Sequence, residues 1–257
     1  MIRFNAFVSL ALAILASAFA PATRSAVGRT PGALEVTGSG TARYSIPIFV
    51  PPGPRGIQPN IALVYDSAIG SGPLGKGWSI AGISSIARCN QTFAQDGVSS
   101  AVSLDTSDGY CLNGNRLKLR AGSYGSSGSQ YFTEITDFSL VTANGTAGNG
   151  PASFTVQDRS GLVYEYGGTA SSLVSATGSS TASSWMLSEI RDRAGNKVVF
   201  SYAAPGNGLS GTTVIKKIEW TQTSPGSSYF INAVEFTYGA NSVLGSDLTP
   251  ANSPERS

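Results

Sequence analysis

The fold of this chain is decided by residues 44–78, which open with Tyr44-Ser45-Ile46-Pro47-Ile48-Phe49-Val50. Apolar and β-branched side chains alternate here with other residues, as in a half-buried β-strand. Pro47 predicts an edge strand or a bulge, because proline has no N–H to donate to a neighbouring strand. Residues 61–65 form a second compact strand, and residues 80–86 a third apolar stretch that Gly82 interrupts.

Three pairs of alternating segments further along predict antiparallel hairpins: residues 154–157 with 162–166, 185–190 with 198–202, and 214–220 with 233–238. The turns between them carry Asp, Gly or Asn, which tolerate positive φ. Segments 121–130 and 167–184 are rich in Ser, Gly and Ala and are predicted to be surface loops. Because no segment beyond the amino terminus holds a helical period, the sequence predicts an all-β fold of successive antiparallel hairpins.

Composition narrows the function classes. Charged residues make up only 12% of the chain, about half of the roughly 25% that is usual for globular proteins. The hydrophobic share of 41% is enough for a core and argues against wholesale disorder. The net charge of +2, with no dense run of Lys or Arg, argues against a nucleic-acid partner.

The amino terminus is typical of a secretory signal. Arg3 precedes an uncharged apolar run over residues 6–19, and small residues follow at cleavage spacing, with cleavage after Ala18 favoured over Ala20. The run is shorter than the roughly 20 residues that span a bilayer, so a retained anchor is the less favoured alternative. We therefore expect a signal peptide (1–20), a flexible lead-in (21–32), a β domain (33–240) and a polar tail (241–257).

Export bears on whether the two cysteines, Cys89 and Cys111, form a disulfide. An oxidising compartment favours their only intramolecular pairing, and closing this loop would stabilise the fold by roughly 3 kcal/mol. Two free buried thiols are the alternative. The chain has no CxxC motif and no His, so zinc or thioredoxin-type chemistry has little support.

Two motifs suggest ligand chemistry that their context does not support. Residues 70–77 fit GxGxxG and approach a phosphate loop, but a strand-like segment follows where a helix is required, so we interpret them as a glycine-rich turn. Residues 105–109 hint at a calcium loop, yet Arg116 stands where an EF-hand needs an acid. An irregular calcium site remains the alternative to a simple Asp-capped turn.

The evidence for a catalytic site is equally weak. Without His, the usual Ser-His or Cys-His pair cannot be built, and no GxSxG elbow occurs. Several carboxylates are present, but no spacing singles out a catalytic pair. We therefore predict no catalytic residue, no cofactor and no metal.

Aromatic residues on the predicted strands are the remaining candidates. Trp185, Trp220 and Tyr202 could stack on a sugar, which makes a carbohydrate-binding or cell-surface module the alternative function. Packing in the core and across strands is the interpretation we favour for all three.

A family resemblance rests on three blocks. The first is Gly40-Thr41-Ala42-Arg43-Tyr44-Ser45-Ile46-Pro47-Ile48, followed by Val50-Pro51-Pro52-Gly53. The others are Cys111-Leu112-Asn113-Gly114-Asn115-Arg116-Leu117, with Asn113 in place of the usual Asp, and the strand-turn-strand unit at residues 185–202. Together they resemble the SpvB-type amino-terminal domain, which begins the B components of insecticidal toxin complexes and many RHS/YD-repeat virulence proteins.

The resemblance implies a structural role. In the toxin complexes this region starts a long β-sheet structure that winds into a hollow cocoon around a toxic polypeptide. The ADP-ribosylating activity of the Salmonella namesake lies in a separate carboxy-terminal domain, so the resemblance carries over no catalytic residue. We expect an exported module, periplasmic, cell-surface or extracellular, whose partner is the remainder of such a shell, in the same or a neighbouring polypeptide. The chain stops far short of usual family members, and we expect a truncated or split reading frame.

Overall fold

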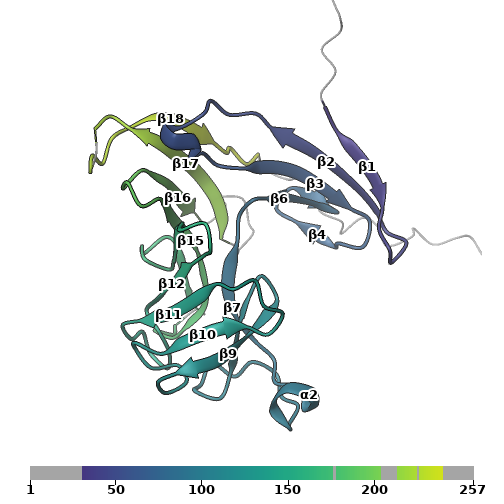
Figure 1. Ribbon diagram of the computed structural model, residues 1–257. Helices are drawn as coiled ribbons and strands as arrows, with labels where there is room; N and C mark the ends of the chain where they lie inside the picture. The colour runs from purple at the N-terminus through teal and green to yellow at the C-terminus, as the bar shows by residue number, and fades with distance from the viewer. Residues whose placement is uncertain (1–30, 176–177, 204–212, 225, 240–257) are drawn as a thin grey trace, which may run out of the picture. The chain divides into compact units, whose positions relative to one another are not determined.

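Strands make up nearly all of the regular structure (Figure 1). The computed structural model describes residues 31–175, 178–203, 213–224 and 226–239, so the predicted signal peptide and polar tail lie outside the described residues. The helical elements are the 3-10 turn η1 (Pro54–Gly56) and the short helix α2 (Phe93–Asp96). The strands are β1 (Ala33–Val36), β2 (Ala42–Ile48), β3 (Ile61–Asp66), β4 (Ser71–Gly72), β5 (Gly75–Lys76), β6 (Trp78–Ala81), β7 (Ser85–Cys89), β8 (Gly109–Leu112), β9 (Asn115–Ala121), β10 (Gln130–Thr133), β11 (Leu140–Asn144), β12 (Ser153–Gln157), β13 (Val163–Tyr166), β14 (Leu173–Ser175), β15 (Ala182–Arg191), β16 (Lys197–Ala203), β17 (Val214–Gln222) and β18 (Phe230–Glu235). The all-β prediction is confirmed.

None of the helices in the described ranges is long and apolar enough to cross a membrane.

The segment around Pro47 belongs to a four-stranded antiparallel sheet with the order β1-β2-β3-β6. Strand β1 pairs with β2 only as far as Ser45, whereas Pro47 pairs with Ala62 of β3. At Pro47 the β1 side of the strand is therefore an edge, which accommodates a residue that cannot donate a hydrogen bond. The strands predicted at residues 44–50 and 61–65 are present as β2 and β3.

Gly82 divides the third predicted apolar stretch between two sheets. Strand β6 ends just before it in the four-stranded sheet, and β7 begins after it in the larger sheet. Gly82 has φ +90°, and a Cβ at this position would lie 2.0 Å from the carbonyl oxygen of Asn60. Only glycine combines this backbone conformation with such a close approach.

Eight strands of the twelve-stranded sheet close into an antiparallel barrel. The pairing runs from β7 through β8, β9, β10, β11, β12 and β13 to β15, and β15 pairs back with β7. Figure 1 shows β9 to β12 lying side by side in this order. Closure leaves the ring without a free edge.

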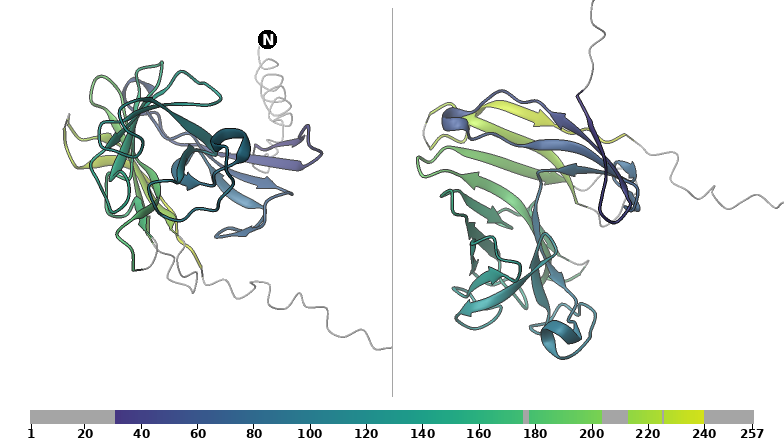
Figure 2. Two further views of the ribbon diagram at one scale, coloured as in Figure 1. Left: turned by 90° about the horizontal axis from the view of Figure 1, so that it is seen from below. Right: turned by 45° about the vertical axis from the view of Figure 1, so that its right-hand side comes forward.

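Strand β15 belongs both to the barrel and to the part of the sheet that extends beyond it through β16, β17 and β18. Its residues Ser184 to Met186 pair with β7, whereas Glu189 to Arg191 pair with both β13 and β16. From β16 the sheet continues through β17 to β18, its last strand (Figure 2). The three predicted hairpins are β12–β13, β15–β16 and β17–β18, and all are confirmed.

The loop prediction is right for residues 122–129 but partly wrong for residues 167–184. The second segment contains strand β14 and the start of β15. Leu173 of β14 pairs with Trp185 and packs against the core, and Val174 pairs with Ser184. The serines that suggested a loop here accompany apolar residues that alternate well enough to complete a short strand.

Aromatic rings fill the barrel interior. The fully buried rings of Tyr110, Tyr131, Phe154 and Trp185 contact one another edge to face, and Phe154 and Trp185 have centroids 4.9 Å apart. Tyr124 stacks on Tyr110 at 5.2 Å. Burial raises the pKa of Tyr110 to about 12, so this hydroxyl stays neutral at any physiological pH.

A buried ion pair closes one end of the barrel. The Arg88 guanidinium lies 3.0 Å from the Asp108 carboxylate, and the two side chains are 1% and 2% exposed. Arg88 also donates to the carbonyl oxygens of Ala182, Asp105 and Asn149. One side chain on β7 thereby holds two loops and the start of β15.

The carboxylate of Asp108 is equally saturated. It accepts hydrogen bonds from the backbone N–H groups of Ser103 and Leu104 and from the Ser103 hydroxyl. A buried charge is costly unless it is paired and hydrogen-bonded, and here both ions meet that condition.

We expect Arg88→Met to lower the free energy of unfolding by about 3–5 kcal/mol, because it leaves Asp108 buried without its countercharge. Urea denaturation of the wild type and the variant measures the change. The matched control is Arg43→Met, which removes the exposed 3.8 Å pair with Glu35 and should cost no more than about 1 kcal/mol. A loss at Arg88 as small as that at Arg43 would contradict the central role of this pair.

Candidate assembly surface

The two suspected ligand motifs have structural roles. The glycine-rich residues 70–77 form the small hairpin of β4 and β5, and strand β6 follows instead of a helix. Asp105 accepts hydrogen bonds from the N–H and hydroxyl of Ser107, and Asp108 faces Arg88. Among the described residues, no three His, Cys, Asp or Glu side chains gather closely enough to hold a metal ion.

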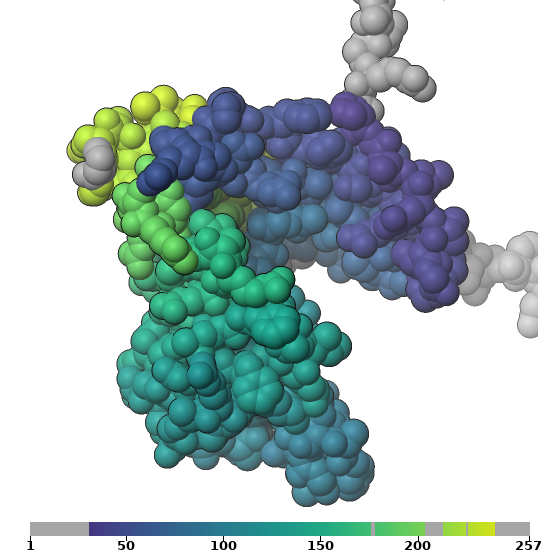
Figure 3. All heavy atoms as spheres, in the orientation of Figure 1, coloured from purple at the N-terminus to yellow at the C-terminus, as the bar shows by residue number. Residues whose placement is uncertain are grey.

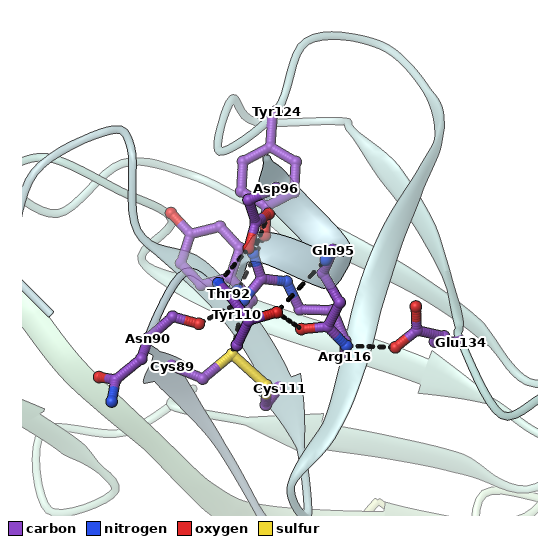
Figure 4. Close-up of a disulfide and its surroundings, with 10 residues drawn as sticks. All are labelled: Cys89, Asn90, Thr92, Gln95, Asp96, Tyr110, Cys111, Arg116, Tyr124 and Glu134. Atoms are coloured by element: carbon purple, nitrogen blue, oxygen red, sulfur yellow. Dashed lines mark hydrogen bonds and ion pairs between the residues drawn. A yellow bond between two sulfur atoms is a disulfide. The ribbon is translucent and has the colours of Figure 1, made fainter. Parts of the chain in front are cut away.

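Cys89 and Cys111 form a disulfide between the neighbouring strands β7 and β8 (Figure 4). Their Cα atoms are 6.0 Å apart, and the register pairs Cys89 with Gly109 and Ala87 with Cys111. The bond therefore links residues on adjacent strands that are offset by two positions. The disulfide stabilises the folded protein because it closes the loop between the two cysteines in the unfolded chain and so lowers the entropy of that chain.

Arg116 covers this disulfide. Its guanidinium donates to the carbonyl oxygen of Asn90, lies 3.4 Å from the Cys89 sulfur and forms an ion pair with Asp96 (Figure 4). A Cβ at residue 109 would lie 2.0 Å from an Arg116 nitrogen, so Gly109 makes room for the guanidinium. Asp96 closes helix α2, whose first turn is capped by the Thr92 hydroxyl. The arginine that excluded an EF-hand thus anchors α2 to the barrel.

The three aromatic candidates lie in the core, where the favoured packing interpretation places them, and the alternative of sugar stacking is corrected. Trp185, Trp220 and Tyr202 are 0%, 1% and 5% exposed. The indole N–H groups of Trp185 and Trp220 donate to the carbonyl oxygens of Pro151 and Pro51, and the Tyr202 hydroxyl donates to that of Leu187. Rings with both faces packed cannot stack on a ligand unless the core opens.

The outer edge of β18 is the clearest unsatisfied surface in the described part of the chain. Strand β18 pairs with β17 and with no other described strand. The N–H of Phe236 donates to Lys216 of β17, and alternate residues of a strand point the same way. The N–H and C=O groups of Ala233 and Glu235 therefore point away from β17; we call these two residues, with the exposed Ile231 beside them, the β18 edge.

Two exposed apolar side chains lie at the β18 edge, beside the charged Glu235. Ile231 is 67% exposed and the adjacent Tyr229 76%. On the opposite face of the strand, Val234 packs against the core. Figure 3 shows β18, in yellow, on the molecular surface. The sequence predicted this hairpin but not which of its two strands would lie at the edge, because the pairing of β17 with β16 was not part of the prediction.

Strand β1 forms a second open edge, in the four-stranded sheet. Leu34 and Val36 are each 73% exposed and lie on the same face as Tyr44. On the same face, Ile48 and Ile61 pack against the core. Monomeric proteins seldom leave apolar residues grouped on an open strand, so both edges are candidates for contact with further polypeptide.

The chain is similar to known proteins in sequence. Residues 36–98 match the family model described as Salmonella virulence plasmid 65kDa B protein. The Mono(ADP-ribosyl)transferases SpvB of Salmonella typhimurium and Salmonella enteritidis are 24% and 25% identical to it over 90% of this chain. The chain spans 42% of the length of these relatives.

Solved structures share the fold. The crystal structure of TcdB2-TccC3 matches 74% of this chain and 10% of its own, with a TM-score of 0.58 and 19% identity. The N-terminal domain of effector protein SpvB from Salmonella typhimurium strain LT2 matches 66% of this chain and 61% of its own, with a TM-score of 0.52 and 23% identity. The resemblance to the SpvB-type amino-terminal domain is confirmed.

We expect the double substitution Cys89→Ala with Cys111→Ala to lower the free energy of unfolding by about 3 kcal/mol, the chain-entropy estimate for a loop of this length. Denaturation with and without reductant measures this effect, and reductant should leave the double variant unchanged. Intact-mass analysis of exported protein should find no alkylation without prior reduction. Free thiols in that material would refute the pairing.

Proposed function

We propose that this chain is a non-catalytic structural module of a secreted bacterial toxin-complex or RHS-type protein. In this role it forms part of the shell that encloses or delivers a toxic polypeptide. The likeness in fold to TcdB2-TccC3, of which it corresponds to about a tenth, supports this proposal. So does the match of residues 36–98 to the SpvB family model.

The observation that carries the proposal is the β18 edge. A strand with unpaired N–H and C=O groups is a template for another strand, and β-augmentation uses these groups for affinity. An added strand would also cover Ile231, whose side chain is mostly exposed. We infer that a strand from the remainder of the shell, in the same or a neighbouring polypeptide, continues the sheet here.

A structural role also fits the chemistry of the chain. It contains no His, and the buried Arg88 and Asp108 saturate each other and nearby backbone groups. The transferase name of the relatives applies to proteins of which this chain spans 42%. We infer that transfer of ADP-ribose belongs to other parts of those proteins, and that this module is exported, since a disulfide requires oxidising surroundings.

We expect the isolated chain to self-associate through its open edge and Ile231→Lys to weaken that association about tenfold or more. Burial of an isoleucine contributes about 1.5–3 kcal/mol, and 1.4 kcal/mol is tenfold in affinity. Sedimentation velocity over a concentration series measures the effect. Ile135→Lys is the control, because Ile135 is 79% exposed but lies outside the edge. Equal association of the two variants would contradict the role of the edge.

The role itself is tested with a photoreactive amino acid at position 231 in the bacterium that makes the protein. The expected crosslinked peptide comes from a β-strand of an RHS/YD-repeat polypeptide. A strict monomer without crosslinks in its native host would sink the proposal. So would transfer of label from NAD⁺ by the purified chain.

A further inference from the structure

A groove of adjoining cavities surrounds the turn at residues 158–162, between β12 and β13. Three cavities of about 540, 620 and 240 Å³ meet there. Ser160 lines the first and second, Asp158 the second and third, and Tyr164 the first and third. The two larger volumes are in the range of small-molecule sites, which often lie in the mouths of barrels.

The groove lies at the barrel end opposite the Arg88–Asp108 pair. The turns at residues 113–114, 134–139, 158–162 and 192–196 all follow strands that run toward this end. Loops at the other end are tied together by Arg88. The turns around the groove are short and connect strands of the closed barrel. Their side chains are therefore held in place by a rigid scaffold.

Asp158 and Tyr164 form a fixed polar wall in the middle of the groove. Asp158 accepts hydrogen bonds from the Ser160 hydroxyl, the Leu162 N–H and the Tyr164 hydroxyl. Burial alone would raise the pKa of Asp158, but these hydrogen bonds outweigh it and lower that pKa. The Ser160 N–H adds a further hydrogen bond to this carboxylate, so Asp158 presents a fixed negative charge in the middle of the groove.

Asp192 and Arg55 continue the wall into the first cavity. Asp192 is held by the N–H groups of Ala194 and Asn196 and by the Asn196 amide. Arg55 lies in a tight turn at φ +56° and is exposed. Among the described residues it has no carboxylate within ion-pair distance. Both residues line the same cavity.

The strands beneath the groove exclude an extended peptide as its occupant. An extended peptide binds most readily along an unpaired strand edge. Strands β12, β13 and β15 are each paired on both sides within the ring, and β16 is paired with β15 and β17. Recognition here must use side chains, which include carboxylates, hydroxyls, amides, guanidinium groups, apolar residues and a half-buried tyrosine ring.

We infer that this groove binds an oligosaccharide of neutral or amino sugars. Sugar hydroxyls donate to fixed carboxylates and accept from hydroxyl, amide and guanidinium groups, all of which line the groove. Tyr164, which is half-buried and lines two of the cavities, provides the apolar contact that a sugar ring needs. This site shares no residue with the three buried aromatic candidates, and it does not depend on the shell role.

The test uses Ser160→Trp, which places a large side chain between the first two cavities. Ser160 is exposed and lies in a turn, so the ring should not be disturbed. The matched control is Ser171→Trp, an exposed turn serine at the other end of the barrel. The probe is a printed array of neutral, amino and acidic oligosaccharides, followed by titration calorimetry with the best-bound neutral or amino member.

The wild type and Ser171→Trp should bind with equal affinity, and Ser160→Trp should bind at least tenfold more weakly. Arg55→Gly, which suits the positive φ of this residue, tests the first cavity independently and should weaken binding severalfold. Absence of array binding, selective binding of acidic members only, or equal binding by Ser160→Trp would each overturn the assignment. Equal loss in both tryptophan variants would overturn its location.

Discussion

The Arg88–Asp108 pair is the interaction on which the barrel depends. It joins β7 to the start of β15 through Ala182, and these two strands are where the ring closes. It also fixes the loops that carry Asp105 and Asn149. A chain with so few charged residues uses this one buried pair to join segments that are far apart in sequence. Hydrophobic packing of the aromatic rings then fills the space that the pair encloses.

The hairpins were predictable because the residues that define each of them lie close together in the sequence. Alternation and turn residues identify β12–β13, β15–β16 and β17–β18 without knowledge of distant partners. Closure of the ring was not predictable, since it depends on the pairing of β15 with β7, about a hundred residues earlier. Gly82 marked a break in the sequence, but only the close approach of Asn60 explains why the chain changes sheets there.

The candidate sites also divide into those that the local sequence predicts and those that depend on contacts between distant segments. The pairing of Cys89 with Cys111 needed only a count of cysteines and a compartment. The burial of Trp185 and Trp220 agrees with the packing interpretation that was favoured from the sequence, although strand periodicity alone did not exclude an exposed sugar-stacking face. The β18 edge and the groove at Asp158 were missed. Each is defined by which backbone groups and turns meet in space, and no short motif records that.

The sharing of β15 between ring and extension has a mechanical consequence. Only three residue pairs, those of Glu189 to Arg191, join β15 to β16, whereas six join β16 to β17. Tension applied at β18 passes through these ladders in series, and a series of connections yields first at its shortest member. Under load, the ladder between β15 and β16 would therefore separate before the others. Strands β16 to β18 would leave together, and the barrel would remain closed.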